Sequence, residues 1–355
     1  IDNIAFTAVP ILSLSGSTLA FTEDVSGALQ IDSAGTVNDA DGDADWNGGT
    51  LEAQITANNE AADSISIVDT DGDGTAITVS GTNILANGTD IGDLNVSGGT
   101  VTNGTKLTIT FDSDATNANV QEVLRSLVYN NTSDTPGTSN RTITVTVTDA
   151  YGASAVDTRT VSVAGSNDSP TATGAPSSIT VTEDVASNVD LSPVTFADPD
   201  GDSLTVTLTA AAGTFAATSG GSVTVGGSGT GTLTLAGTAA NINTFLDTPA
   251  NIKYTTSSNS NAGTSFTIKA NDGTVNPTLG TVSIGIVAVN DAPVFSNLDG
   301  DSFTYTEGDG QTVIDQGTAL ALTDIDSADL DGGNLTATIT SGEDAAEDLL
   351  SLDIS

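Results

Sequence analysis

The stretch Val289-Asn290-Asp291-Ala292-Pro293 decides how this chain is organised. It follows a run of alternating apolar residues over 281–287, and a weaker copy, Ser166-Asn167-Asp168-Ser169-Pro170, follows a similar run over 158–163. In each copy the proline ends the strand and stiffens the exit, while the Asn and Asp side chains place oxygen atoms at the boundary. Both stretches are therefore interpreted as joints between domains, and their oxygen atoms could hold a cation.

Outward from these joints, the same features recur in the same order along the chain. Thr22-Glu23-Asp24 corresponds to Thr182-Glu183-Asp184, and the acidic loop 39–43 corresponds to 198–202; a helical segment and a late aspartate turn follow in both copies. Such an order indicates internal repeats. We expect four parts: the end of a preceding segment or a lead-in over 1–9, repeat 1 over 10–168, repeat 2 over 169–291, and the N-terminal part of an incomplete repeat 3 over 292–355.

The third copy stops before the helix and the last strands of the repeat. Half a sandwich would leave an unpaired edge and a bare apolar face. We therefore expect either that the chain continues beyond Ser355 or that another molecule supplies the rest. A chain that starts at Ile1 is also interpreted as a processed product or an excerpt of a longer one.

Short alternating runs of apolar residues, separated by Gly, Asn and Asp turns, predict an all-β fold of tandem immunoglobulin-like or cadherin-like β-sandwiches. One segment, 119–129, departs from this alternation, because its apolar residues recur at positions 120, 123, 124 and 127. That spacing is helical. Residues 240–246 occupy the same place in repeat 2, so we predict one short crossover helix per repeat.

The composition restricts the possible partners and chemistry. The 355 residues include 46 Asp and Glu against 6 Lys and Arg, a net charge of -40, so nucleic acid and anionic membrane surfaces are poor partners and divalent cations are natural ones. There is no cysteine and no histidine, which excludes disulfides, thiolate zinc sites and Ser-His catalysis. No apolar run approaches the roughly 20 residues that span a bilayer, so membrane insertion is not expected. Abundant Gly, Thr and Ser suit an extracellular β protein.

The aspartate clusters carry oxygen atoms at alternate positions with a glycine nearby, which suits a loop that wraps a hard cation. Calcium (Ca2+) accepts 6 to 8 oxygen ligands in irregular geometry, whereas magnesium requires a strict octahedron, so calcium is favoured. Two carboxylates about 5 Å apart repel by roughly 3 kcal/mol at an effective dielectric constant near 20. The run 69–74 is interpreted equally as a site or as a turn, because repeat 2 does not reproduce it. Asp43, Asp45 and Asp202 are interpreted either as members of these clusters or as turn residues only.

The order Thr-Glu-Asp, Asp-x-Asp, a late Asp, then Asn-Asp-x-Pro resembles the bacterial cadherin-like tandem repeats of large secreted adhesins of the RTX/VCBS type, over nearly the whole chain. Such repeats are sandwiches strung end to end with calcium at each junction. The resemblance implies ligands at the first joint from Glu23, Asn167, Asp168, Asp198, Asp200 and Asp272. At the second joint it implies Glu183, Asn290, Asp291, Asp324 and Asp326. Asp39, Asp41 and Asp149 would face whatever precedes residue 1.

These observations favour a calcium-rigidified extracellular spacer or adhesion stalk of a bacterial surface protein. Its partners would be calcium, neighbouring repeats or copies of itself, and surface glycans or another cell. One alternative is a subunit of an extracellular filament or surface layer, in which a neighbouring chain completes repeat 3. A second is a calcium-dependent carbohydrate-binding module in which Trp46 or Tyr151 stacks on a sugar, although an aromatic residue covering its own sheet end is favoured. Paired carboxylates at the tips of small sandwiches lack the cleft that a glycosidase needs, so we expect no enzyme activity.

Overall fold

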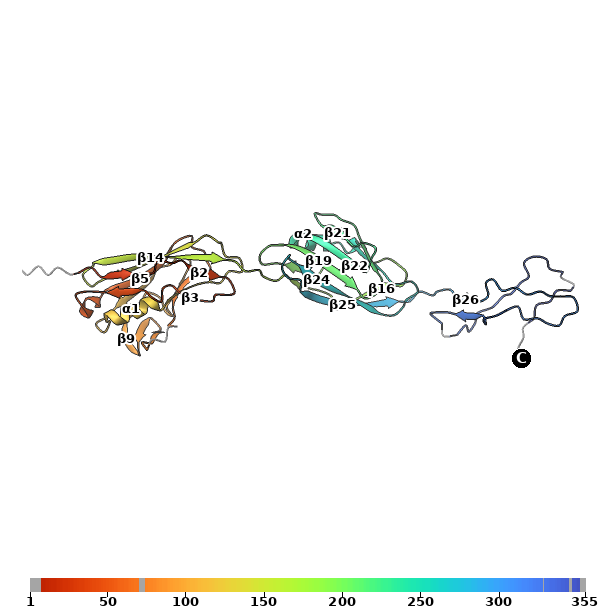
Figure 1. Cartoon of the computed structure of the whole chain (residues 1–355), viewed down its shortest axis with the longest axis horizontal. Helices are drawn as coiled ribbons and strands as arrows, with labels where there is room; N and C mark the ends of the chain where they lie inside the picture. The colour runs from red at the N-terminus through yellow and green to blue at the C-terminus, as the bar shows by residue number, and fades with distance from the viewer. Residues whose placement is uncertain (1–7, 70–73, 328, 345–346, 352–355) are drawn as a thin grey trace, which may run out of the picture. The chain divides into compact units, whose positions relative to one another are not determined.

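The computed structural model describes residues 8–69, 74–327, 329–344 and 347–351. Most of the lead-in predicted over 1–9, and most of the acidic run 69–74, therefore lie outside the described residues. The chain forms two compact units (Figure 1). Unit 1 consists of residues up to Ser169 together with Asp198–Asp200, and unit 2 consists of Pro170–Ala197 and the residues from Gly201 onward.

Unit 1 is built from two large sheets and one short ribbon. The first sheet has the order β2 (Leu19–Thr22), β14 (Ser154–Ala164), β13 (Arg141–Thr148), β5 (Thr50–Ala57), β11 (Leu107–Phe111), β9 (Thr89–Leu94), β8 (Asn83–Ala86) and β7 (Ile77–Ser80). The second has the order β10 (Thr100–Thr102), β6 (Asp63–Ile67), β12 (Leu127–Asn131) and β3 (Leu29–Gln30). The ribbon pairs β1 (Ile11–Ser13) with β4 (Thr36–Asn38).

The core of unit 1 lies between these sheets because side chains alternate along each strand. On β13 every second residue is buried, including Ile143, Val145 and Val147, and Ile65 of the other sheet belongs to the same core. Each such side chain contributes roughly 1.5–3 kcal/mol when it leaves water. Trp46, the one tryptophan of the sequence, is fully buried in this core.

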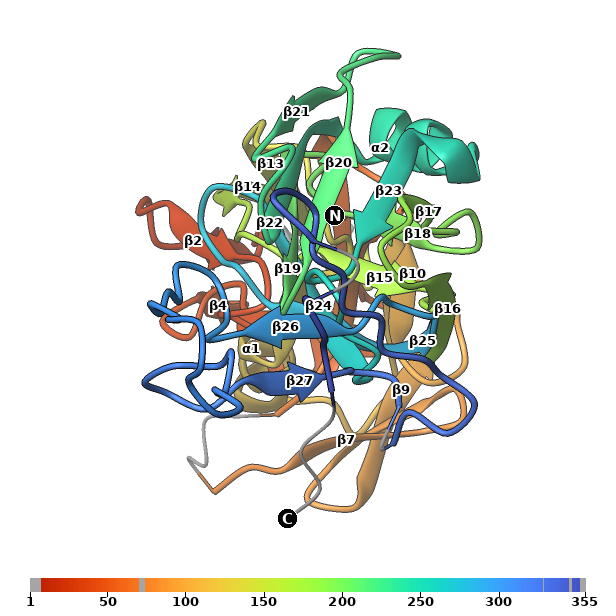
Figure 2. The ribbon, with the colours of Figure 1, turned by 90° about the vertical axis from the view of Figure 1, so that its right-hand side faces the viewer.

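Unit 2 repeats the plan on a smaller scale. Its main sheet has the order β16 (Ser178–Thr182), β25 (Thr278–Val287), β24 (Thr264–Asn271), β19 (Ser203–Ala210), β22 (Thr232–Thr238) and β21 (Thr224–Gly226). The second sheet has the order β17 (Ser187–Asn188), β23 (Ile252–Thr255) and β20 (Thr214–Ala217), and a ribbon pairs β15 (Thr171–Thr173) with β18 (Thr195–Ala197). β20 and β23 lie side by side in Figure 2. Phe215 makes edge-to-face ring contacts with Tyr254 and Phe266 at the centre of its core.

The two units share an unusual pairing. In unit 1, β14 pairs in parallel with β2, and in unit 2, β25 pairs in parallel with β16, whereas the other strand pairs are antiparallel. Each pairing brings the Thr-Glu-Asp triplet at the end of the early strand next to the segment that leaves the last strand. The predicted joints therefore begin where these two strands end.

Each unit contains one short helix, as predicted. Helix α1 (Asn117–Arg125) is capped by Thr116, whose Oγ1 accepts a hydrogen bond from Asn119 N at 3.2 Å. Helix α2 (Ala239–Leu246) is capped in the same way by Thr238. The first helix is shorter than the segment predicted over 119–129: it ends at Arg125, because residues 127–131 pair with β6 as β12. Two 3-10 helices cover Asp43–Trp46 and Pro249–Asn251.

The prediction of an all-β fold of tandem sandwiches with one short helix each is confirmed by these two units. Within the described part of 292–351, the structure contains one ribbon, β26 (Val294–Ser296) paired with β27 (Ala321–Thr323), visible in Figure 2. The assignment of this segment to a third repeat stays a prediction. Among the described residues, none of the helices has the length and apolar character that crossing a membrane would require.

Candidate cation sites

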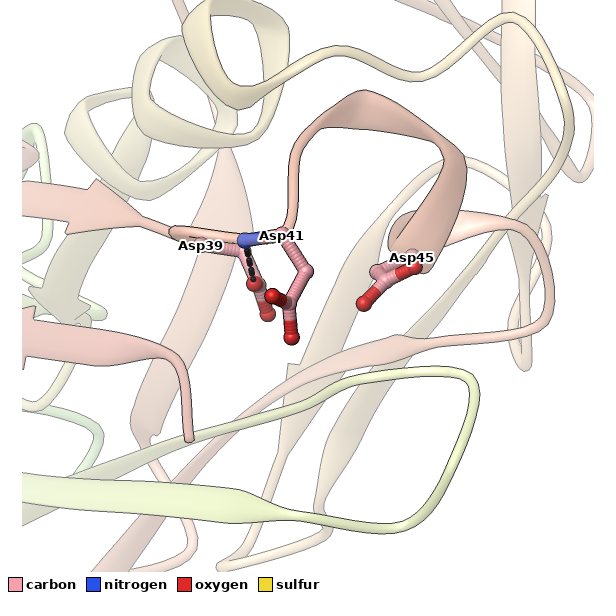
Figure 3. A group of neighbouring side chains, drawn as sticks. All are labelled: Asp39, Asp41 and Asp45. Atoms are coloured by element: carbon pink, nitrogen blue, oxygen red, sulfur yellow. Dashed lines mark hydrogen bonds between the residues drawn. The ribbon is translucent and has the colours of Figure 1, made fainter. Parts of the chain in front are cut away.

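The first acidic cluster lies in the loop that follows β4. Asp39, Asp41 and Asp45 each offer a carboxylate oxygen, and these atoms all lie within 4.8 Å of one another. Figure 3 shows the three side chains projecting from one loop into the same space, with Asp41 N donating a hydrogen bond to Asp39 Oδ1 at 2.9 Å. Gly42 has a φ of 102°, which lets the backbone turn between them. The 3-10 helix Asp43–Trp46 brings the carboxylate of Asp45 into the group.

Asp149 lies beside this group in the turn between β13 and β14, where the neighbouring Ala150 N donates to Asp45 O at 2.7 Å. We call the four residues Asp39, Asp41, Asp45 and Asp149 the loop cluster. The charge of Asp149 acts on Asp45: burial raises the pKa of Asp45 above its usual value of 3.8, and Asp39, Asp41 and Asp149 raise it further. One oxygen of Asp149 accepts hydrogen bonds from Tyr151 N and Ala153 N, at 2.8 and 2.9 Å.

The loop cluster contains buried oxygen atoms that lack hydrogen-bond partners. Asp39 and Asp149 are each 2% exposed and Asp45 is 8% exposed, and the Oδ2 atom of each is buried without a partner. None of the ion pairs among the described residues involves these side chains. A buried carboxylate oxygen without a hydrogen bond or a counter-charge is costly. The donor set therefore fits a cation that prefers oxygen ligands.

The second acidic group of unit 1 surrounds Glu23, which follows β2 and is 3% exposed. Glu23 Oε2 accepts a hydrogen bond from Ser166 N at 3.0 Å, while Glu23 Oε1 is buried without a partner. Asp168 N donates to Asp200 Oδ2 at 2.7 Å, and Asp168 Oδ2 is also buried without a partner. The parallel pairing of β2 with β14 thus brings Glu23 and Asp168 close together.

The charges of further acids act on Glu23 and Asp168. Burial raises the pKa of Glu23 above its usual value of 4.5; the hydrogen bond from Ser166 opposes this, and the charges of Asp168, Asp24 and Asp200 add to it. The pKa of Asp168 is raised by burial and by four acids, namely Asp24, Asp200, Asp134 and Asp198. A pocket of about 330 Å³ borders Glu23, Asp24 and Asp134.

Sequence reasoning missed Asp24 and Asp134 as members of this group. Asp24 was visible in the Thr-Glu-Asp triplet but was not assigned. Asp134 carried no signal, because it lies in an ordinary loop after β12 that meets Glu23 through tertiary folding alone.

The remaining predicted residues of the first joint are placed as follows. Asp198, Asp200 and Asp202 follow β18 in one loop, and their carboxylate oxygens lie within 4.8 Å of one another. Asp272 follows β24, and its Oδ1 accepts from the N–H groups two and three residues later, Thr274 N and Val275 N, whereas Asp149 accepts from those two and four residues later. The assignment of Asp272 to the first joint stays a prediction.

The third acidic group lies in unit 2. Glu183, Asp291 and Asp326 offer oxygen atoms within 4.8 Å of one another. Glu183 is fully buried, and its Oε1 has no partner, like Asp291 Oδ2. Burial raises the pKa of Asp291 above its usual value of 3.8, and nearby negative charges raise it further. These charges belong to Asp326, Asp184, Glu183 and Asp324. Asp324 Oδ1 accepts from Asp326 N at 3.0 Å, which fixes the loop.

The groups around Glu23 and Glu183 repeat one pattern of hydrogen bonds. Each glutamate accepts from a backbone N–H that follows the last strand, Ser166 N or Val289 N, at 3.0 Å in both cases. Asp168 N donates to Asp200 at 2.7 Å, and Asp291 N donates to Asp326 at 2.6 Å. The side chains of Asn167 and Asn290 each donate to the carbonyl oxygen of the aspartate that follows. The same bonds occur in two sequence-divergent copies, so this arrangement of acidic side chains is a repeated feature of the fold.

The two aromatic residues considered for sugar stacking differ in exposure. Trp46 is fully buried, packs edge to face on Phe111 with ring centroids 6.0 Å apart, and donates its indole N–H to Asn117. It therefore has no face available for a sugar. Tyr151 is 70% exposed.

Comparisons with known proteins establish no family. No family model matches the sequence, and no curated protein matches it. Solved structures that resemble the chain include extracellular cadherin domains 1–5 of protocadherin gamma B2 (13% identity, TM-score 0.30), covering 82% of this chain and 42% of that one. Others are Drosophila N-cadherin EC1-4 (12%, TM-score 0.24; 89% and 59% covered) and the C-terminal domain of the Streptococcus agalactiae AgI/II polypeptide BspA (10%, TM-score 0.20; 78% and 99% covered). These TM-scores are too low to support a conclusion about family, ligand or function.

Proposed function

We propose that the chain is a calcium-rigidified extracellular spacer or adhesion stalk of a surface protein, with a mechanical and non-catalytic role. The observation that carries this proposal is the set of buried carboxylate oxygens without partners, gathered in three groups at the ends of strands. The same hydrogen-bond pattern at Glu23 and Glu183 supports it, because chance turns would not repeat it. The proposed partners are calcium and neighbouring repeats or copies of the chain.

Calcium is the cation that suits these groups best. The ligands are carboxylate and carbonyl oxygens from loops, and the sequence has no histidine or cysteine to attract softer metals. Calcium accepts 6 to 8 oxygens at about 2.3–2.6 Å and tolerates irregular loops. The ions would be held by Asp39, Asp41, Asp45 and Asp149, by Glu23, Asp168, Asp198 and Asp200, and by Glu183, Asp291, Asp324 and Asp326. Asn167, Asn290 and Asp272 are proposed as further ligands.

The mechanism follows from where these residues lie along the chain. Glu23 ends an early strand, whereas Asp168 lies in the segment that leaves the last strand, where a proline stiffens the path. When the ion is bound, it supplies the positive charge that lets these carboxylates lie together. The linker is then fixed to the body of the unit through Glu23 and Asp200. Without the ion, repulsion between the carboxylates favours a loosened linker.

The stalk proposal is tested by measuring length and flexibility. Small-angle X-ray scattering of the chain in calcium is expected to give a longer and less flexible particle than in EGTA, because the linker segments are then fixed. Magnesium at the same concentration is the control and is expected to restore little of the length. If the particle dimensions and the melting temperature are the same in calcium and EGTA, the proposal is wrong.

Lowering the pH is expected to have opposite effects on the stability of the cation-free chain and of the calcium-bound chain. Because the pKa values of Glu23, Asp168 and Asp291 are raised in the folded state, that state takes up protons before the unfolded one. In metal-free buffer, the free energy of unfolding should therefore rise as pH falls from neutral through the raised folded-state values, and the gain is complete below the usual values of 4.5 and 3.8. In calcium, the same acidification should lower stability, because protons compete with the ion.

Thermal unfolding at a series of pH values, in metal-free and in calcium-containing buffer, gives the slope of stability against pH in each buffer. Slopes of the same sign in the two buffers would contradict this assignment of the acids.

A further inference from the structure

Asn117, the first residue of α1, is bonded to three residues of the loop that carries the loop cluster. Its Oδ1 accepts from Asp39 N at 2.7 Å and from the Trp46 indole N–H at 3.1 Å, and its Nδ2 donates to Asp39 O at 3.1 Å. Its own backbone N–H donates to Asp43 Oδ1 at 2.8 Å. The side chain thus holds both backbone groups of Asp39 and the Trp46 end of the 3-10 turn, while the backbone N–H of Asn117 holds the Asp43 end.

Helix capping does not explain these bonds. The capping oxygen of α1 belongs to Thr116, which accepts from Asn119 N, so the Asn117 side chain is not needed to start the helix. It points instead at the backbone that places Asp39. The helix packs on β4, which leads directly into the loop.

Unit 2 contains similar hydrogen bonds between an asparagine of its short helix and the strand that leads into its acidic loop. Asn243 of α2 accepts from Phe196 N at 2.8 Å and donates to Phe196 O at 2.9 Å. Phe196 lies on β18, two residues before Asp198 in the sequence. In both units, therefore, the side chain of one asparagine in the short helix forms hydrogen bonds with the backbone N–H and C=O of a residue at or just before the acidic loop. Relative to the first aspartate of the acidic loop, the residue held in unit 2 lies two positions earlier than the residue held in unit 1. The two arrangements are therefore not a copy of one sequence motif.

We propose that Asn117 is a positioning residue for cation binding at the loop cluster, and that the short helix serves this site in addition to packing Val120, Val123 and Leu124 into the core. The inference rests on the proposed calcium function. The bonds from Asn117 fix the backbone at Asp39 and the turn at Asp43–Trp46, so that the carboxylates of Asp39, Asp41 and Asp45 converge before the ion arrives. Residues that orient metal ligands in this way typically change metal affinity by 10- to 100-fold when mutated.

Terbium(III) luminescence tests this site alone. Trp46 is the one tryptophan and neighbours Asp45 in the sequence, so selective tryptophan excitation sensitises a terbium ion at the loop cluster far more than one elsewhere. In the full chain, Asn117→Ala is expected to weaken terbium binding by about 10- to 100-fold and to weaken its displacement by calcium similarly. Asn243→Ala is the matched control, because it removes the same kind of grip in unit 2, and it should leave this signal unchanged.

The outcomes separate the two proposals. If the wild-type chain gives no sensitised emission that calcium displaces, both the calcium site and the role of Asn117 are wrong. If the wild type binds and folded Asn117→Ala binds with the same affinity, the positioning role alone is wrong. An equal loss in Asn243→Ala would also overturn it, because the effect would then be a general loss of stability. Folding is checked by circular dichroism, because Asn117 is itself a hydrogen-bond partner of Trp46, and Asn117→Ser replaces the alanine variant if that one does not fold.

Discussion

Chelation of calcium is expected to lower the melting temperature of unit 1 by on the order of 10 °C. A ligand present at 1,000 times its dissociation constant stabilises the folded state by about 4 kcal/mol per site. For a domain of 150–250 residues, each kcal/mol corresponds to roughly 2–4 °C. Calorimetry in calcium and in EGTA measures the shift, and the chain concentration is held constant between the two.

The variant Asp45→Asn gives a more specific test, because it should raise the melting temperature in EGTA and lower it in calcium. Asparagine has nearly the same shape but no charge, so in EGTA it relieves the burial of a charge and the repulsion from Asp39, Asp41 and Asp149, which together raise the pKa of Asp45, and it should raise the melting temperature. In calcium it removes a ligand and should lower the melting temperature. Asp93→Asn, on the exposed side of β9, is the control that removes one charge outside the loop cluster. A loss of stability in both buffers would contradict the ligand role of Asp45.

The acidic loops could be predicted from the sequence because their signals are local. Asp-x-Asp spacing, a nearby glycine and the recurrence of Thr-Glu-Asp are all visible within a few residues, and Asp39, Asp41 and Asp198 with Asp200 indeed gather into groups. The grouping of Asp45 depends on a 3-10 turn and on Asn117, which is 71 residues away from Trp46. No spacing rule contains that information.

Part of the sheet was missed although its signal was present. Strands β8 and β9 were not predicted, yet Asn87-Gly88 between them is a strong hairpin signal, and both residues have positive φ, 52° and 82°. The alternation around it is weak because Asp90 and Gly92 interrupt the apolar pattern. Gly92 has a φ of 150° and lies so close to the Thr110 carbonyl that a side chain would not fit there.

A buried ion pair in unit 1 could not be predicted from the sequence, since its partners are 78 residues apart. Asp63 on β6 and Arg141 on β13 are both fully buried, and Arg141 Nε donates to Asp63 Oδ2 at 3.0 Å. Asp63 Oδ1 also accepts from the Tyr129 hydroxyl at 2.5 Å and from Asn131 Nδ2 at 2.7 Å. Burial raises the pKa of Tyr129, and the hydrogen bond to Asp63 adds to this, so the hydroxyl remains a donor at neutral pH.

Replacing Arg141 by methionine is expected to destabilise unit 1 by about 3–5 kcal/mol, because it leaves Asp63 charged and buried without its counter-ion. It also removes the donors to Gly137 O and Ser139 O. The loss is expected in calcium and in EGTA alike, since neither Asp63 nor Arg141 belongs to the acidic groups described above. Urea unfolding followed by Trp46 emission measures it, because Trp46 and Tyr129 belong to the same core.

The matched control is Lys106→Met, which removes an ion pair of similar length on the surface. Lys106 Nζ lies 2.7 Å from Glu52 Oε1, but the two side chains are 45% and 27% exposed, so the loss should be at most about 1 kcal/mol. Asp63→Leu combined with Arg141→Met should cost less than the sum of the two single changes, because no unpaired charge then remains buried. Tyr129 and Asn131 would still lack their acceptor, so recovery should be partial. If Arg141→Met costs no more than Lys106→Met, the pair does not carry the stability that its burial implies.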